Sequence, residues 1–166
     1  VLVSSAGQAA VISGTVSDWA EFSSPLTIGD GANSVQTLWS QNSWNKGYFY
    51  GSGGGIVEGS DVAFASGVTN ISELTDASVF SFDSYVTDAL CDADCDPNGV
   101  GNFIVMRNNT SGYYGALRID DITGIFPDGK LNGTWWFQTD GSSDFSVVPI
   151  PAAAWLFGTA VFGLGF

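Results

Sequence analysis

The sequence of 166 residues contains no histidine, only four lysines and arginines, and only two cysteines. Without histidine, the chain cannot form a Ser-His-Asp triad, a Cys-His catalytic pair or a zinc site with histidine ligands. The 17 acidic residues and the net charge of -13 would repel phosphate backbones, which argues against nucleic acid as a partner. Three glutamates and two lysines leave little material for ion pairs along helices.

Glycine, small polar residues and aromatic residues dominate the chain instead. There are 22 glycines, and 45% of the residues are hydrophobic and 14% aromatic. Valine, threonine and aromatic side chains favour strands, whereas glycine, serine, asparagine and aspartate favour turns. We therefore predict one all-β domain, an antiparallel β-sandwich of the jelly-roll-like or Ig-like kind, with a partly closed barrel as the alternative.

Alternating hydrophobic and polar positions locate the strands of this domain, which we expect to span residues 11–146. The expected strands are 11–16, two within 34–50 around an Asn42-Ser43 turn, 61–65, 79–82, 102–107, 113–119 and 131–139. We expect residues 71–75 to form a helical turn or a bulge, and residues 108–112 to form a hairpin turn. In Tyr113-Tyr114 and in Trp135-Trp136, one ring should face the core and the other should face outward.

The two ends of the chain differ from this domain in composition. Residues 1–10 are uncharged, and Gly7-Gln8-Ala9 has the small-x-small form that a signal peptidase accepts. This favours the remnant of a signal peptide, with an ordinary first strand as the alternative. No charged residue follows Asp144, and an apolar run of fifteen residues begins at Ala152. It predicts a truncated transmembrane segment, a C-terminal hydrophobic helix, with a buried strand or helix as the alternative.

A short proline motif stands at the start of the C-terminal segment 147–166. It consists of Val148, Pro149, Ile150, Pro151, Ala152, Ala153, Ala154, Trp155, Leu156, Phe157 and Gly158. This stretch resembles the Val-Pro-Leu-Pro-Ala variant of the PEP-CTERM sorting signal of Gram-negative bacteria. Ile150 replaces the usual Leu or Glu, and the basic cluster that completes such signals is not in the sequence.

The resemblance implies a partner, a destination and a role. The implied partner is an exosortase-like membrane protease that processes the tail. Proteins of this class are exported, are held at the inner membrane by the tail until processing, and then belong to the cell surface or the extracellular matrix. The resemblance therefore implies a secreted structural or interaction protein with no catalytic activity of its own.

The loop 88–99 combines acidic residues with both cysteines. Asp92, Asp94 and Asp96 alternate, so an extended loop could direct three carboxylates at one calcium ion, the single cofactor that the sequence allows for. The alternative is a solvated acidic loop. Cys91 and Cys95 are four residues apart, and for an exported protein this predicts a local disulfide in preference to metal or redox chemistry.

The aromatic residues and the carboxylates each allow a second kind of function. Exposed rings could stack on sugars in a lectin-like module that binds polysaccharide, for which the candidates are Trp44, Tyr114 and Trp136; core packing is the alternative. A glycoside hydrolase would need a carboxylate pair, for which the candidates are Glu21, Glu58, Asp120 and Asp121. For Asp120 and Asp121, the alternative is that they are acidic residues at the end of a strand, with Arg118 in a cross-strand ion pair. Arg107 is also expected to pair with an aspartate.

Overall fold

The computed structural model describes residues 11–41, 47–52, 57–87 and 99–146. The strands are β1 (Val11–Ala20), β2 (Leu26–Ile28), β3 (Val35–Gln41), β4 (Gly47–Tyr50), β5 (Ser60–Phe64), β6 (Tyr85–Thr87), β7 (Phe103–Asn108), β8 (Tyr114–Thr123) and β9 (Lys130–Gln138). The short 3-10 helices are η1 (Gly31–Asn33), η3 (Ile71–Glu73) and η4 (Ala77–Val79). The predicted all-β class is confirmed for the part of the chain that these ranges cover.

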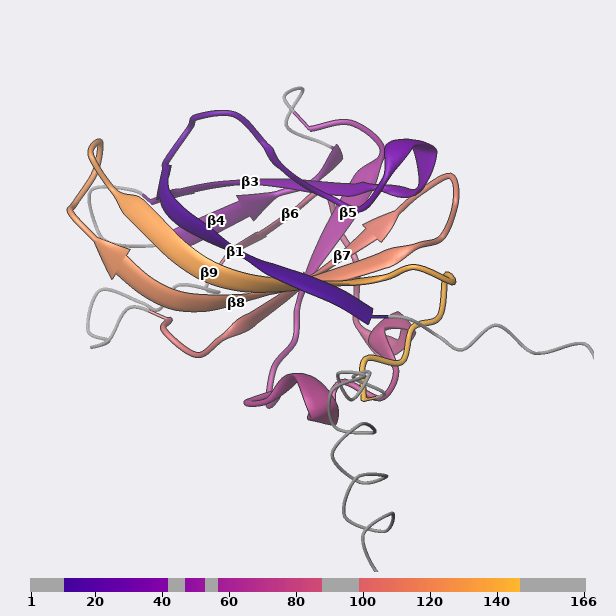
Figure 1. Cartoon of the computed structure of the whole chain (residues 1–166). Coiled ribbons are helices and arrows are strands. Elements are labelled where there is room, and N and C mark those ends of the chain that lie inside the picture. Colours follow the sequence, from indigo (N-terminus) through magenta and orange to yellow (C-terminus); the bar gives the residue numbers. More distant parts are fainter. Residues whose placement is uncertain (1–10, 42–46, 53–56, 88–98, 147–166) are drawn as a thin grey trace, which may run out of the picture.

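Two antiparallel sheets face each other in separate layers (Figure 1). One has the order β1-β9-β8-β7-β5 and the other the order β2-β3-β4-β6. The sheets do not close into a barrel. They meet at one edge only through a bridge, in which Val62 of β5 exchanges backbone hydrogen bonds of 2.9 Å with Asp83. At the opposite edge, no ladder between β1 and β2 is found in the described residues.

Each face of the five-stranded sheet carries its own hydrophobic core. The core between the sheets contains Trp39 and Phe49 from one layer and Leu117 from the other, all fully buried. The second core lies on the outer face, where η3, η4 and the segment around Phe145 cover Phe103 and its neighbours. Because both faces are covered, the expected outward-facing rings are packed as well: Tyr113 and Trp135 border the first core, and Tyr114 and Trp136 the second.

Two tryptophans tie the layers together through hydrogen bonds as well as through packing. The indole Nε1 of Trp39 in β3 donates to the backbone oxygen of Trp19 in β1 at 2.9 Å. The indole Nε1 of Trp19 donates in turn to the backbone oxygen of Ser24 at 3.0 Å. Both donors are thus satisfied, so these large rings are buried without the cost of an unpaired N–H.

The expected strands are found at their predicted places except for one, and the structure adds two short strands, β2 and β6, that the sequence analysis did not predict. The expected strand at 79–82 is wrong, because η4 ends at Val79 and the next residues run as an irregular segment. The carboxylate of Asp76 accepts a hydrogen bond from the backbone N–H of Ser78 at 2.9 Å, which starts a 3-10 turn where alternation predicted extended chain. Phe80 and Phe82 pack on the second core from this segment. The helical turn expected at 71–75 is confirmed as η3.

Residues 1–10 and 147–166, expected to be a signal remnant and a hydrophobic C-terminal helix, lie outside the described residues. Within the described ranges, no helix has the length and apolar character needed to cross a bilayer.

The carboxylates that cap η3 and η4 should make stability depend on pH. Backbone N–H groups of Thr69 and Asn70 lower the pKa of Glu73, and the hydroxyls of Ser78 and Ser143 lower the pKa of Asp76. A carboxylate whose pKa is lower in the folded state than in the unfolded state stabilises the folded state at pH values above its unfolded pKa. This stabilisation is lost as the pH falls through its folded pKa. We therefore expect the difference in Tm between the native chain and a Glu73→Gln/Asp76→Asn variant to shrink between about pH 6 and about pH 3.

Thermal unfolding followed by circular dichroism at several pH values measures this difference. Ser78→Ala, which removes one hydroxyl donor to Asp76, should reproduce part of the effect at neutral pH. A Tm difference that stays constant over the whole range would contradict the assignment.

Candidate functional site

Several residues singled out in the sequence lie outside the described part of the chain. They are Asp92, Asp94 and Asp96 of the calcium hypothesis, Cys91 and Cys95, Trp44, and the whole motif from Val148 to Gly158. These predictions therefore stay predictions. Within the described residues, no group of three or more metal-ligating side chains comes together.

Glu21 is a buried carboxylate whose two oxygens bind the backbone. Its side chain lies where the chain crosses from β1 toward β2 and is only 7% exposed. One carboxylate oxygen accepts from the backbone N–H of Gln41 at 3.0 Å, and the other from that of Gly129 at 2.9 Å. A side chain at Gly129 would collide with Gln41 and Glu21, so glycine allows this close approach. Glu21 thus fastens the β8–β9 loop to β3, which is a structural task.

Asp120 and Asp121 lie at a β-bulge in β8. The pairing with β9 slips between Ile119 and Asp121, so Ile119 and Ile122 both pack on the inter-sheet core although they are three residues apart. The alternation that would place the two aspartates on opposite faces is broken here. Asp120 accepts from Arg118 Nε at 2.6 Å and from the Thr134 hydroxyl at 2.5 Å. The ion pair of Arg118 therefore lies within one strand, not across two as expected.

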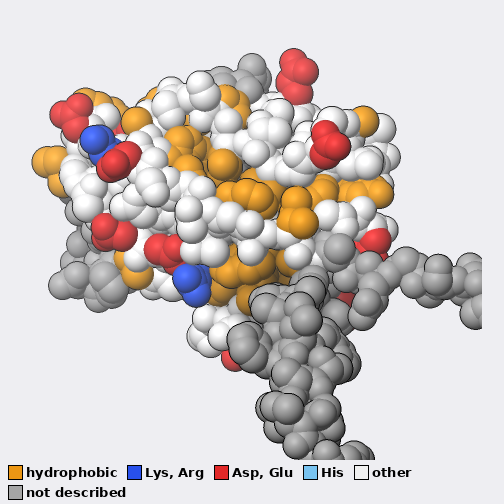
Figure 2. Space-filling view, viewed as in Figure 1, with side chains coloured by type: hydrophobic (Ala, Val, Ile, Leu, Met, Phe, Trp, Pro, Cys, Tyr) orange, Lys and Arg blue, Asp and Glu red, His pale blue; other side chains and the backbone are white. Residues whose placement is uncertain are grey.

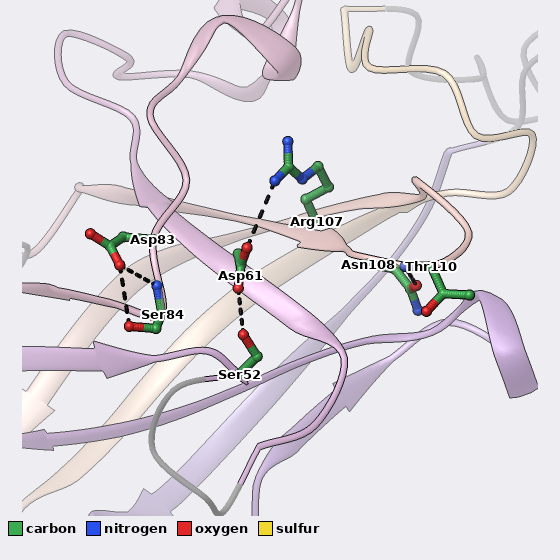
Figure 3. Close-up of polar contacts among 7 residues, drawn as sticks. All are labelled: Ser52, Asp61, Asp83, Ser84, Arg107, Asn108 and Thr110. Carbon is green, nitrogen blue, oxygen red and sulfur yellow. Dashed lines mark hydrogen bonds and ion pairs between the residues drawn. The ribbon is translucent and has the colours of Figure 1, made fainter.

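Arg107 makes the cross-strand pair that was expected of an arginine. It stands opposite Asp61 of β5 in the sheet register, with 3.7 Å between Nη2 and Oδ2 (Figure 3). Partial burial raises the pKa of Asp61, but hydrogen bonds from Ser52 and Asn109 and the charge of Arg107 lower it more, so the net shift is downward. The guanidinium also lies 4.6 Å above the Phe82 ring. This cluster secures the β5 edge and the loop before β6.

The two described residues of the sugar-contact hypothesis lie on the outer face of the five-stranded sheet. Trp136 is 8% exposed, with Phe103 stacked on it at 5.7 Å and the Arg118 guanidinium at 5.7 Å from its centroid. Tyr114 is half-buried against Phe82. Little of the Trp136 ring is accessible to a sugar, so its main role in the described fold is packing.

A more exposed group of rings lies on the outer face of the four-stranded sheet. Tyr48 and Tyr50 flank the core-facing Phe49, so they point to the opposite face, and Tyr85 of β6 stands opposite Tyr50. The Tyr48 and Tyr50 rings stack at 6.2 Å, and Phe22 lies 6.4 Å from Tyr50. Phe22 is 54% exposed and Tyr85 is 52% exposed. We call Phe22, Tyr48, Tyr50 and Tyr85 the aromatic strip.

Phe22 adopts a backbone conformation that bulky residues rarely accept. Its φ is 51°, in the left-handed region. The backbone N–H of Phe22 donates to Trp39 at 3.1 Å, and the neighbouring Glu21 is held by its carboxylate, so the crossing segment enforces this geometry. The result is an aromatic ring held out toward solvent beside Tyr50.

The unpaired edge between β1 and β2 is hollowed into a cleft of about 270 Å³. Its wall is formed by Ile12, Tyr113 and Phe137, and its rim by Asp30, Asn33 and Thr139. The Tyr113 and Phe137 rings stack at 5.9 Å with an interplanar angle of 15°. Figure 2 shows hydrophobic side chains along a band between the two layers on this side of the molecule. We call this hollow the open-edge cleft.

The side chain of Asn108 holds both sides of the open-edge cleft in place. Its Nδ2 donates to the backbone oxygen of Ser34 at 2.6 Å, next to η1, and its Oδ1 accepts from the backbone of Thr110 and Ser111. Its own N–H donates to the oxygen of Tyr113 at 2.9 Å. Figure 3 shows Asn108 at the turn after β7. The sequence marked 108–112 as a turn, but nothing in it placed that turn beside η1.

Asp30 and Asn33 were missed at the sequence level because a short Asp-Gly-Ala-Asn stretch resembles any polar turn. The packing of Gly29 against the Phe137 ring helps to bring η1 over β9, and a Cβ at Gly29 would lie 2.7 Å from that ring. No known protein family, curated protein or solved structure matches the chain.

Glu21 and Glu58 offer a matched test of the buried carboxylate. In Glu21→Gln, the amide NH2 replaces one of the two oxygens that accept from the backbone N–H groups of Gln41 and Gly129, so one of these donors is left without an acceptor. We therefore expect the free energy of unfolding to fall by about 1–3 kcal/mol. Glu58→Gln changes an exposed side chain and should stay within about 0.5 kcal/mol of the native chain. Urea unfolding followed by tryptophan fluorescence measures both. Equal effects of the two substitutions would contradict the role given to Glu21.

Proposed function

We propose that the chain is an exported protein of the cell surface or extracellular matrix of a Gram-negative bacterium, with a C-terminal tail that an exosortase-like membrane protease processes. The observation that carries this proposal is the run from Val148 to Gly158, which has the proline pair, the small residues and the apolar continuation of such a signal. The role of the tail is topological: it retains the domain at the outer face of the inner membrane until it is cut.

The last described residues before the proposed motif are held firmly to the domain. Phe145 is fully buried in the second core, and its backbone N–H donates to Leu74 at 2.8 Å. Two residues before Phe145, the backbone oxygen of Ser143 accepts a hydrogen bond from the backbone N–H of Ala77 at 2.7 Å. These contacts fasten residues 143–145 to the domain, and Val148, where the proposed motif begins, follows three residues after Phe145.

A structural or interaction role, without catalysis, fits the use of the described carboxylates. Glu21 binds backbone amides, Asp61 pairs with Arg107, and Asp120 pairs with Arg118 and Thr134. Each of these three carboxylates binds another group of the fold. In a glycoside hydrolase, by contrast, the two catalytic carboxylates must be directed at the substrate. In this proposal the protein is a substrate of the processing enzyme and takes part in the matrix through its surface.

Substitution of the two motif prolines tests the sorting proposal. In a Gram-negative host that carries an exosortase, we expect the native chain with its natural flanking sequence to be converted to a shorter form, and Pro149→Ala/Pro151→Ala to remain uncut in the membrane fraction. Pro25→Ala, which changes a proline of the domain, is the matched control and should be processed normally. Immunoblots of cell fractions measure both. Normal processing of the double variant would refute the proposal.

Carbohydrate binding is a second candidate function, favoured by the aromatic strip. Flat rings stack on the C–H faces of sugars, and the exposed Tyr85 adds a hydroxyl that can bond to a sugar hydroxyl. The strip contains no charged side chain, and the domain is strongly acidic, so a neutral polysaccharide suits it better than an anionic one.

Removal of the two most exposed rings tests this second candidate. Phe22→Ser/Tyr85→Ser should weaken retention on insoluble neutral polysaccharides by roughly tenfold, since two ring contacts are lost at about 0.5–1.5 kcal/mol each. Val79→Ser, which alters an exposed apolar side chain of η4 on the far side of the other sheet, should bind as the native chain does. Pull-down isotherms on cellulose, chitin and mannan provide the comparison. Equal retention of all three proteins would remove the aromatic strip as a binding surface.

A further inference from the structure

We propose that the open-edge cleft is a binding site for a single neutral pyranose ring, such as the end or a side branch of a polysaccharide. The inference rests on the carbohydrate-binding candidate function but names a different surface from the aromatic strip. The cleft lies between β1 and η1, whereas the strip lies on the outer face of the four-stranded sheet.

The lining of the cleft has the two chemical characters that a sugar ring needs. A pyranose has an apolar C–H face and a rim of hydroxyls. Ile12 and the Tyr113–Phe137 stack provide an apolar and aromatic wall for the first. The exposed side chains of Asp30 and Asn33 provide a carboxylate and an amide for the second. An apolar wall with a few convergent polar groups is the usual composition of a small-molecule site.

The volume of the cleft fits one ring. At about 270 Å³ it lies just below the roughly 300–1,000 Å³ of pockets that hold drug-sized ligands. A single pyranose is smaller than such ligands, and a longer chain would have to extend out along the open edge. The cleft is therefore suited to a terminal or branching sugar.

The cleft is already formed in the folded domain without a ligand. Asn108 fixes the Ser34 end of η1 and the turn that leads to Tyr113, and Gly29 lets the corner after β2 lie against Phe137. A site that is held in place by such hydrogen bonds before binding loses less conformational entropy when a ligand binds, so weak individual contacts suffice.

The charge of the site selects against anionic sugars. Asp30 lies on the rim, and the whole chain carries a net charge of -13, so a uronate or a phosphorylated sugar would meet repulsion. A neutral hydroxyl group can donate to the Asp30 carboxylate instead. The preference for a neutral over an acidic sugar of the same shape is therefore a specific expectation for this site.

The test uses NMR titration of the isotope-labelled chain with methyl glucoside, methyl galactoside, methyl mannoside and N-acetylglucosamine, and with glucuronate as the anionic counterpart. We expect at least one neutral sugar to shift the amide signals of Asp30, Asn33 and Tyr113, with a Kd in the millimolar range, and glucuronate to bind at least about tenfold more weakly. Asp30→Ala and Asn33→Ala change exposed side chains and should each weaken the neutral sugar by about tenfold without a change in Tm.

The outcomes separate this inference from the candidate function on which it rests. Shifts confined to residues of the aromatic strip, and lost in Phe22→Ser/Tyr85→Ser, would overturn the cleft as the site and leave carbohydrate binding in place. Binding that survives both Asp30→Ala and Asn33→Ala would also overturn the cleft. The absence of any shift with every sugar, together with no retention on polysaccharide, would overturn both.

Discussion

The crossing of the chain from β1 to β2 is the constraint on which the two-layer structure depends. Within a few residues, Trp19 receives the hydrogen bond of Trp39, Glu21 binds the backbone of Gln41 and Gly129, and Phe22 donates to Trp39. These contacts join β1, β3 and the β8–β9 loop, which belong to different layers and to distant parts of the sequence. Hydrophobic burial between the sheets supplies most of the stabilisation, but this crossing sets how the sheets are placed relative to each other.

The same crossing explains why one edge of the structure is sealed and the other is open. At the far edge, the bridge between Val62 and Asp83 and the cluster around Asp61 connect the layers directly. At the near edge, the described residues contain no ladder between β1 and β2, and η1 lies over β9 without a strand pairing in this part of the chain. The open-edge cleft lies at this edge, where Phe137 of the inter-sheet core is part of its lining.

Much of the fold could be predicted from the sequence, because period-two alternation is a local signal. The strands β7 and β9 and the start of β8 were located to within one residue, as was the turn at Ile71, whereas β8 continues to Thr123, four residues beyond its predicted end. The strand expected at 79–82 failed because the Asp76 side chain competes with extended backbone, and the alternation at Asp120 failed because a bulge is decided by pairing with β9. The cleft could not be predicted, since Asp30, Tyr113 and Phe137 come from three segments that only the three-dimensional arrangement brings together.

The burial of Phe145 limits how an enzyme could reach the tail. Four peptide steps separate this anchored residue from Pro149, and a fully extended chain spans at most about 3.6 Å per residue, so the first proline lies no more than about 14 Å from the anchor. A membrane protease acting on the motif would have to work almost against the surface of the folded domain. Under the proposed processing, the side of the domain that carries Phe145, with η3 and η4, would therefore lie nearest to the membrane while the enzyme acts.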